Sequence, residues 1–182
     1  MQKLTLVCNH GCKLVIVNFD VNKWVLLSYR VPREPSTPRI AIWRKLNQLG
    51  VAKIVDGLVA LPDSDTTRDR LEWVAVSARQ AGGSAAVWVA EFTDITESES
   101  LRAQMNEERN EEFADLRAEV ESTSGVDART INRWRRTWRA IQQRDYFGAE
   151  DGELARIAIA DVVTNGRILN VKSEVEQQES RR

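Results

Sequence analysis

Residues 23–92 alternate between short runs of β-forming residues and longer runs whose apolar residues recur at helical spacing, and this alternation constrains the fold most strongly. The β-forming runs lie at 24–31, 51–56, 58–62 and 84–92, and helical runs follow the first and the third. This order of strands and helices is typical of the split βαβ arrangement. We therefore expect an α+β fold. Its first domain, over residues 23–93, would be a ferredoxin-like sandwich in which helices cover one face of a four-stranded antiparallel sheet.

The segment PREPSTPR, residues 32–39, separates the first strand from the first helix. It holds three prolines, which cannot donate a backbone hydrogen bond and have a fixed φ, so it must be a loop. The loop ends where a helix begins. We expect Ser36 or Thr37 to cap this helix and Pro38 to take its first position.

Basic side chains gather around this loop. From Lys23 to Lys53 the chain carries seven basic residues and a single acid, Glu34. Free N–H groups and the dipole at a helix start favour a bound anion, so we expect an oxyanion or a nucleic-acid phosphate here. The candidate residues are Arg30, Arg33, Ser36, Thr37, Arg39, Arg44 and Lys45. The alternative is a solvated surface on which the arginine stems pack against Trp43.

Residues 94–163 are expected to be helical, and residues 164–182 a polar tail. An acidic helix over 97–121 would be followed by an arginine-rich helix over about 127–147 and a shorter helix over 151–163. Arginines interleaved with tryptophans can indicate nucleic-acid or membrane-surface binding. The acidic helix before them favours the alternative, a helical hairpin held by complementary charge along its flanks.

The pentapeptide CNHGC, residues 8–12, contains both cysteines and the only histidine of the chain. It offers at most three soft ligands, whereas a closed zinc site needs four. It also lies before the first predicted strand. We therefore expect residues 1–22 to be a poorly ordered N-terminal extension, and we expect neither a metal nor a cofactor.

Several functional classes find little support in the sequence. It contains no G-x-S-x-G, P-loop or dinucleotide-binding motif, and one histidine excludes most His-based triads and His-cluster metal sites. We therefore do not expect an enzyme. No apolar run approaches the roughly 20 residues that cross a bilayer. Two cysteines four positions apart make no disulfide framework, so we expect a cytoplasmic protein.

The stretch WVLLSYRVPREPSTPRIAIWRKLNQLG resembles the N-terminal domain of the chromate-resistance regulator family ChrB. The later stretches DGLVALPDSDTTRDRLEWVAVSARQAGGSAAVWVAE and QQRDYFGAEDGELA resemble the same family, so the resemblance covers about residues 23–163. It implies a chromate-responsive transcriptional regulator. Members of the family carry a second, C-terminal domain, which we do not expect in this chain.

More distantly, the sandwich resembles the middle domain of phenylacetate-pathway repressors and a CRISPR spacer-acquisition subunit, which pack as dimers on or near nucleic acid. The resemblances imply a DNA-associated homodimer that binds promoter DNA and chromate or a related oxyanion. Two alternatives stay open. One is an enzyme, either a chromate reductase or a nuclease, and the other is a structural module for dimerisation or docking.

Overall fold

A computed structural model of the chain describes residues 5–9, 13–17, 22–124 and 126–164. The chain divides into two compact units, which consist of residues 1–106 with 146–148 and of residues 107–145 with 149–182. The division falls within the long helix α3 (Ile95–Ser122), which begins in the first unit and ends in the second.

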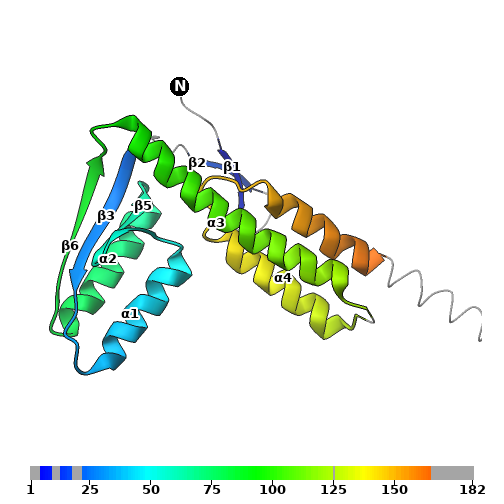
Figure 1. Ribbon diagram of the computed structural model, residues 1–182, viewed down its shortest axis with the longest axis horizontal. Helices are drawn as coiled ribbons and strands as arrows, with labels where there is room; N and C mark the ends of the chain where they lie inside the picture. Colours follow the sequence, from blue (N-terminus) through cyan, green and yellow to red (C-terminus); the bar gives the residue numbers. More distant parts are fainter. Residues whose placement is uncertain (1–4, 10–12, 18–21, 125, 165–182) are drawn as a thin grey trace, which may run out of the picture. The chain divides into compact units, whose positions relative to one another are not determined.

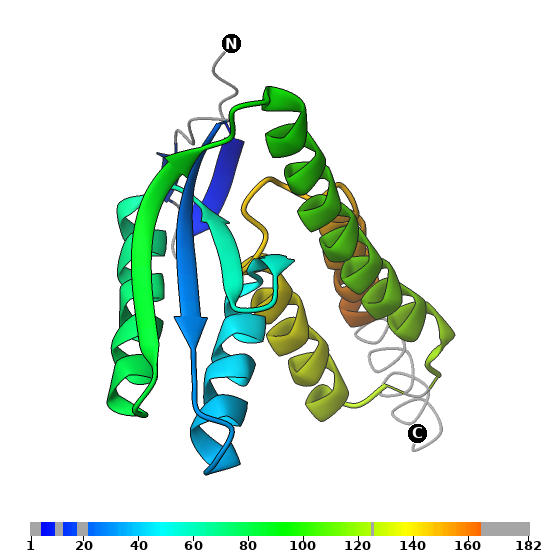
Figure 2. The same cartoon turned by 60° about the vertical axis from the view of Figure 1, so that its left-hand side comes forward.

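The first unit contains a four-stranded antiparallel sheet in the order β4-β5-β3-β6. Its strands are β3 (Lys23–Arg30), β4 (Ala52–Val55), β5 (Leu58–Pro62) and β6 (Ser84–Glu91). Helix α1 (Ser36–Leu49) follows β3, and helix α2 (Asp65–Gln80) follows β5. The predicted sequence of strands and helices is therefore confirmed, and α1 and α2 lie on the same side of the sheet (Figures 1 and 2).

The core of the first unit lies between the sheet and these two helices. Val25 and Leu27 of β3 are completely buried, as are Leu71 and Val74 of α2. The alternation of side chains along a strand sends Val25 and Leu27 to the same face of the sheet. Full burial of each such side chain stabilises the fold by about 1.5–3 kcal/mol, so this apolar layer is the main determinant of the fold.

Trp24 points to the opposite face of β3 and is also buried. Its indole N–H donates to the hydroxyl of Ser98 in α3, and its ring makes edge-on contacts with Phe92 and Phe147. The segment 146–148 thus belongs to the first unit although it follows α4 (Ala128–Gln142) in the chain. Tyr146 adds a hydrogen bond from its hydroxyl to the backbone oxygen of Leu49 at 2.7 Å.

The turn between β4 and β5 requires a glycine. Gly57 has a φ of 77°, in the left-handed region, and its carbonyl accepts the N–H of Tyr29 at 2.7 Å. A Cβ atom at this position would lie 2.6 Å from the backbone oxygen of Tyr29. The predicted hairpin over 51–62 is confirmed, and Gly57 brings its turn against the end of β3.

The predicted start of α1 is wrong in its details. Pro35 holds the N-cap position in an extended conformation, with φ −68° and ψ 149°, and the helix begins at Ser36. Neither Ser36 nor Thr37 caps the helix, and Pro38 is its third residue. Proline is tolerated here because the first-turn N–H groups have no intrahelical acceptor.

The second unit is helical and consists of the C-terminal part of α3, helix α4 and a helix over residues 151–164. Its core contains Phe113, Leu116, Val120, Trp134, Ile141, Ala155 and Ile159. The apolar stripe predicted for the arginine-rich helix is confirmed, since Trp134 and Ile141 are buried and Ile131 and Trp138 are partly buried. The helix ends at Gln142, before the predicted end at residue 147.

Two short strands near the N-terminus, β1 (Thr5–Asn9) and β2 (Lys13–Val17), pair as an antiparallel ribbon. Cys8 lies in β1, while His10 and Cys12 lie outside the described residues, as do most of the predicted polar tail and the rest of residues 1–21. The predictions for these segments and for the CNHGC motif therefore stay predictions. Across the described residues, no helix is long and apolar enough to cross a membrane.

Candidate functional site

The N-terminus of α1 has unsatisfied hydrogen-bond donors, and Glu34, the acid nearest to it in sequence, precedes its N-cap residue Pro35. No side chain caps it, and its first turn contains no acid. Because Pro35 and Pro38 have no N–H, only the N–H groups of Ser36 and Thr37 lack an intrahelical acceptor. Both residues are exposed and carry hydroxyls that can donate further bonds. The positive end of the helix dipole adds to this preference for an anion.

Three arginines of the predicted set belong to this end of the domain. Arg30 ends β3, Arg33 lies in the loop and Arg39 lies in the first turns of α1, and all three are exposed. No hydrogen bond or ion pair engages their guanidinium groups within the described part of the chain. Trp43, on which the alternative would pack their stems, remains 53% exposed.

The other two predicted residues lie further along α1 and face different directions. Lys45 Nζ lies 5.7 Å from the ring centroid of Trp73 in α2, so it belongs to the flank that faces α2. Arg44 follows Arg39 by five positions, which is about 140° around the helix axis. A small anion bound at the start of α1 would therefore lie away from Arg44 and Lys45.

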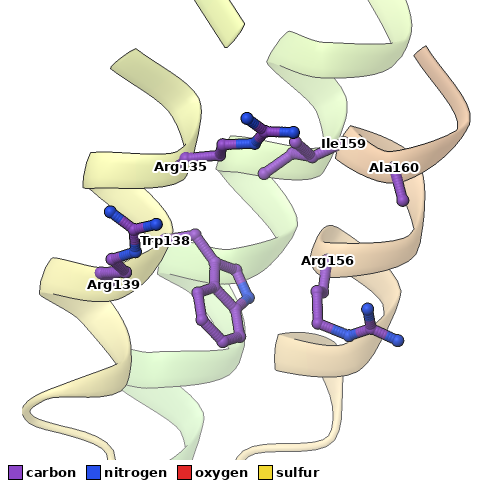
Figure 3. Close-up of a pocket in the computed structure, with 6 residues that line it drawn as sticks. All are labelled: Arg135, Trp138, Arg139, Arg156, Ile159 and Ala160. Atoms are coloured by element: carbon purple, nitrogen blue, oxygen red, sulfur yellow. The ribbon is translucent and has the colours of Figure 1, made fainter. Parts of the chain in front are cut away.

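A second basic cluster lies in the second unit, where Figure 3 shows a groove between α4 and the helix over 151–164. Its lining residues are Arg135, Trp138, Arg139, Arg156, Ile159 and Ala160. The groove has a volume of about 250 Å³. This is below the roughly 300–1,000 Å³ of drug-sized ligand pockets, so it suits a small anion or one phosphate group.

The charges in this groove are only partly balanced. Arg156 forms a double hydrogen bond with Glu153, with Nε–Oε2 at 2.8 Å and Nη2–Oε1 at 2.5 Å, which also holds the pKa of Glu153 below its usual value. Arg135 and Arg139 are exposed, and no acid pairs with them among the residues that the structure describes. The indole N–H of Trp138 donates to Gly152 O at 2.8 Å and fixes the apolar wall beside them.

Two other arginines, Arg133 of α4 and Arg144 just after this helix, test the helical hairpin that the sequence predicts. Arg144 Nη2 lies 2.7 Å from an oxygen of Glu112, and Arg133 pairs with Glu119, so both bind acids of α3. Charge complementarity within the helical hairpin is thus confirmed for these two arginines. It does not extend to the arginines of the groove.

The sequence indicates the arginines of α4 as candidates, but it does not show that Arg156 lines the same groove as Arg135 and Arg139. The spacing of Arg135 and Arg139, four positions apart, places them on one face of a helix and is visible in the sequence. The approach of the following helix, which brings Arg156 and Ile159, depends on packing around Trp134 and Phe113. As for metals, the described residues show no group of three or more His, Cys, Asp or Glu able to hold an ion.

Two comparisons with known proteins bear on this arrangement. A family model described as "Protein ChrB, N-terminal" matches residues 39–167. The match includes the whole groove of the second unit but only Arg39, Arg44 and Lys45 of the predicted anion site. Protein ChrB of Cupriavidus metallidurans is 26% identical over 146 residues, which cover 76% of this chain and 44% of that relative. The chain therefore spans less than half the length of the curated relative that it matches.

Proposed function

We propose a regulatory role for this chain, which belongs to the family described as "Protein ChrB, N-terminal". In this proposal the chain is a chromate-responsive, cytoplasmic regulator that associates with promoter DNA and does not catalyse a reaction. The observation that carries the proposal is the start of α1, which has no side-chain cap and no acid in its first turn, and which Arg33 and Arg39 flank in sequence. This arrangement suits a doubly charged oxyanion.

Chromate is a tetrahedral dianion with four acceptor oxygens. The N–H groups and hydroxyls of Ser36 and Thr37 can donate to it, and Arg30, Arg33 and Arg39 can supply balancing charge. Two of these arginines come from the loop and the strand end, so a bound anion would draw the loop toward the helix. This is how oxyanion binding would be coupled to a change in the shape of the first unit.

DNA association would use the second basic cluster. Arg135 and Arg139 are exposed, lack an acidic partner among the described residues and lie on one helix face, so they can contact successive phosphates of a nucleic-acid backbone. Such contacts position a protein on DNA without reading its sequence. The groove therefore accounts for affinity in this proposal, and sequence preference would need further contacts.

The finer fold assignment also belongs to this proposal. We assign the first unit to the ferredoxin-like sandwiches, supported by the order β4-β5-β3-β6 and by α1 and α2 on one side of the sheet. A homodimer is proposed as the functional form.

A titration of the purified chain with chromate, and separately with sulfate, tests the oxyanion site. We expect saturable binding of chromate that weakens about tenfold in Arg33→Ala and in Arg39→Ala, because each removes a charge-assisted contact. Arg129→Ala, which removes an exposed arginine at the start of α4, is the matched control and should bind as the wild type does. Equal affinities in all four proteins would show that the site is elsewhere.

The same titration separates binding from catalysis. A bound chromate keeps its absorption band, whereas reduction abolishes it in proportion to the electron donor supplied. Stoichiometric binding without loss of the band is expected. Catalytic loss of the band in the presence of a thiol or a reduced nicotinamide would instead support the reductase alternative, with Cys8 and Cys12 as the first residues to replace.

A further inference from the structure

Strand β6 is one edge of the sheet and carries no charge from Ser84 to Ala90. Trp88 is 50% exposed and Val89 is 48% exposed. Within the described residues no strand pairs with the outer side of β6, which Figure 1 shows along the margin of the first unit. Long apolar edge strands are templates for pairing with another chain, and natural proteins usually protect them.

The opposite edge of the same sheet is protected. Strand β4 has only four residues, its pairing with β5 shifts register between Lys53 and Val55, and Lys53 is exposed. A short, irregular and charged strand resists edge-to-edge pairing. Because the edge at β4 is protected and the edge at β6 is not, the open edge of β6 is a candidate binding surface.

The direction of the backbone groups of β6 follows from the hydrogen bonds of β3. The N–H of Tyr29 donates to Gly57 O, and the carbonyl of Lys23 accepts the N–H of Asp63, so odd-numbered residues of β3 bond toward β5. Backbone groups alternate along a strand, so even-numbered residues of β3 bond toward β6. The register pairs these residues with Ser84, Ala86, Trp88 and Ala90.

The remaining residues of β6 therefore direct their N–H and C=O groups to the open edge. These residues are Ala85, Val87, Val89 and Glu91. The contact of Arg79 agrees with this assignment, because its Nη1 donates to Ala85 O at 3.0 Å. One end of the open edge thus carries Arg79 of α2, which also pairs with Glu72, and the other end carries Glu91, which pairs with Lys23.

We infer that β6 pairs with β6 of a second copy of this chain, antiparallel and with the twofold axis at Trp88. In this register Val87 opposes Val89 of the second copy, and Ala85 opposes Glu91 of the second copy. The edge groups of these residues then form about eight backbone hydrogen bonds, and in two of these the acceptor, Ala85 O, also keeps its bond from Arg79. The two sheets become one continuous sheet of eight strands.

Two features select this register. Trp88 faces Trp88 of the second copy in a non-hydrogen-bonded pair, where cross-strand side chains lie closest and aromatic pairs are favourable. Arg79, which reaches Ala85 O and pairs with Glu72, lies in this register beside Glu91 of the second copy, which pairs with Lys23 of its own chain at 3.8 Å. Each end of the interface therefore joins two ion pairs of opposite polarity. Because β6 has no charge between these ends, antiparallel pairing with itself opposes no like charges.

Cysteine cross-linking tests the register. In the full chain with Cys8→Ser and Cys12→Ser, Trp88→Cys places two thiols on the twofold axis, with Cα atoms about 4.5 Å apart, within the range of a disulfide. We expect mild oxidation to convert this variant to a covalent dimer. Val55→Cys, on the protected edge and 62% exposed, is the matched control and should stay monomeric. If Trp88→Cys cross-links no more than Val55→Cys, the inference is wrong.

Sedimentation of the unmodified chain over a range of concentrations provides an independent measurement. A monomer–dimer equilibrium is expected, and Val89→Lys should weaken it about tenfold or more by placing charge on the open edge, while Val55→Lys should not. Arg79→Glu should weaken dimerisation, and adding Glu91→Arg should restore it. A wild-type chain that remains monomeric at high micromolar concentration, or a dimer that Val89→Lys leaves unchanged, would overturn the inference. Neither result depends on whether the chain binds DNA or chromate.

Discussion

The indole N–H of Trp24 donates a hydrogen bond to the hydroxyl of Ser98 across 2.8 Å, between residues 74 positions apart in the chain. Trp24 is 2% exposed and Ser98 is 0% exposed. The bond fixes the start of α3 against the face of β3 that α1 and α2 leave open. It therefore makes the first turns of α3 part of the first unit.

Ser98→Ala should lower the free energy of unfolding by about 1–3 kcal/mol, because it leaves a buried N–H without this acceptor. Urea denaturation followed by tryptophan fluorescence measures the loss. Ser100→Ala, at an exposed position of the same helix, is the control and should change stability by less than about 0.5 kcal/mol. Equal losses in the two variants would contradict the role given to this bond.

Gly57→Ala should destabilise the chain more than Gly82→Ala does. Both glycines have a φ of 77°, so both variants bear the cost of about 1–2 kcal/mol for a left-handed alanine. A Cβ at Gly57 would also lie 2.6 Å from Tyr29 O, whereas at Gly82 the nearest atom, in Pro32, lies 3.9 Å away. Thermal melts of both variants compare the two costs. Equal shifts in the melting temperature would show that the close approach to Tyr29 is unimportant.

Stability of the helical hairpin should fall in acid. The indole N–H of Trp134 and the guanidinium of Arg133 hold the pKa of Glu119 below its usual value of 4.5. A carboxylate with a lowered folded-state pKa contributes stability above its unfolded pKa, and this stability is lost as the pH falls through the folded pKa. Between neutral pH and about pH 3, Glu119→Gln should therefore lose less stability than the wild type. Glu111→Gln, at an exposed position of α3, should retain the wild-type loss.

The sequence predicts those features of the fold best that depend on residues close together in the chain. The strands of the sheet follow from runs such as WVLLSYRV, and Gly57 follows from the turn between two β-forming runs. The N-cap residue of α1 is harder to predict, because three prolines in one loop permit several cap positions. Only the extended conformation of Pro35 selects one of them.

Contacts between segments that are far apart in the chain cannot be predicted from local sequence patterns. Arg135 and Arg139 share a helix face that the sequence reveals, but Arg156 joins them through the packing of another helix. Tyr146 falls within the helix that the sequence predicts over about 127–147, yet its hydroxyl donates to Leu49 O, 97 positions away. Such contacts depend on tertiary packing, which overrides the local preference for helix.

Arg139→Ala should lower the salt dependence of DNA binding. Loss of one phosphate contact reduces the slope of log affinity against log salt concentration by about 0.9. Lys53→Ala removes the same charge from the edge strand β4, which does not line the groove, and should leave the slope unchanged. Fluorescence anisotropy at several salt concentrations measures the slopes. An unchanged slope in Arg139→Ala would exclude the groove from the DNA interface.

One measurement decides whether this chain is a DNA-associated regulator that responds to chromate. Anisotropy of a labelled DNA fragment from upstream of the gene for this chain is followed during titration with the protein, at low salt, with and without chromate. We expect binding that weakens steeply with added salt and that changes at least several-fold with chromate but not with an equal concentration of sulfate. Absence of binding at low salt, or binding that chromate leaves unaltered, would contradict it.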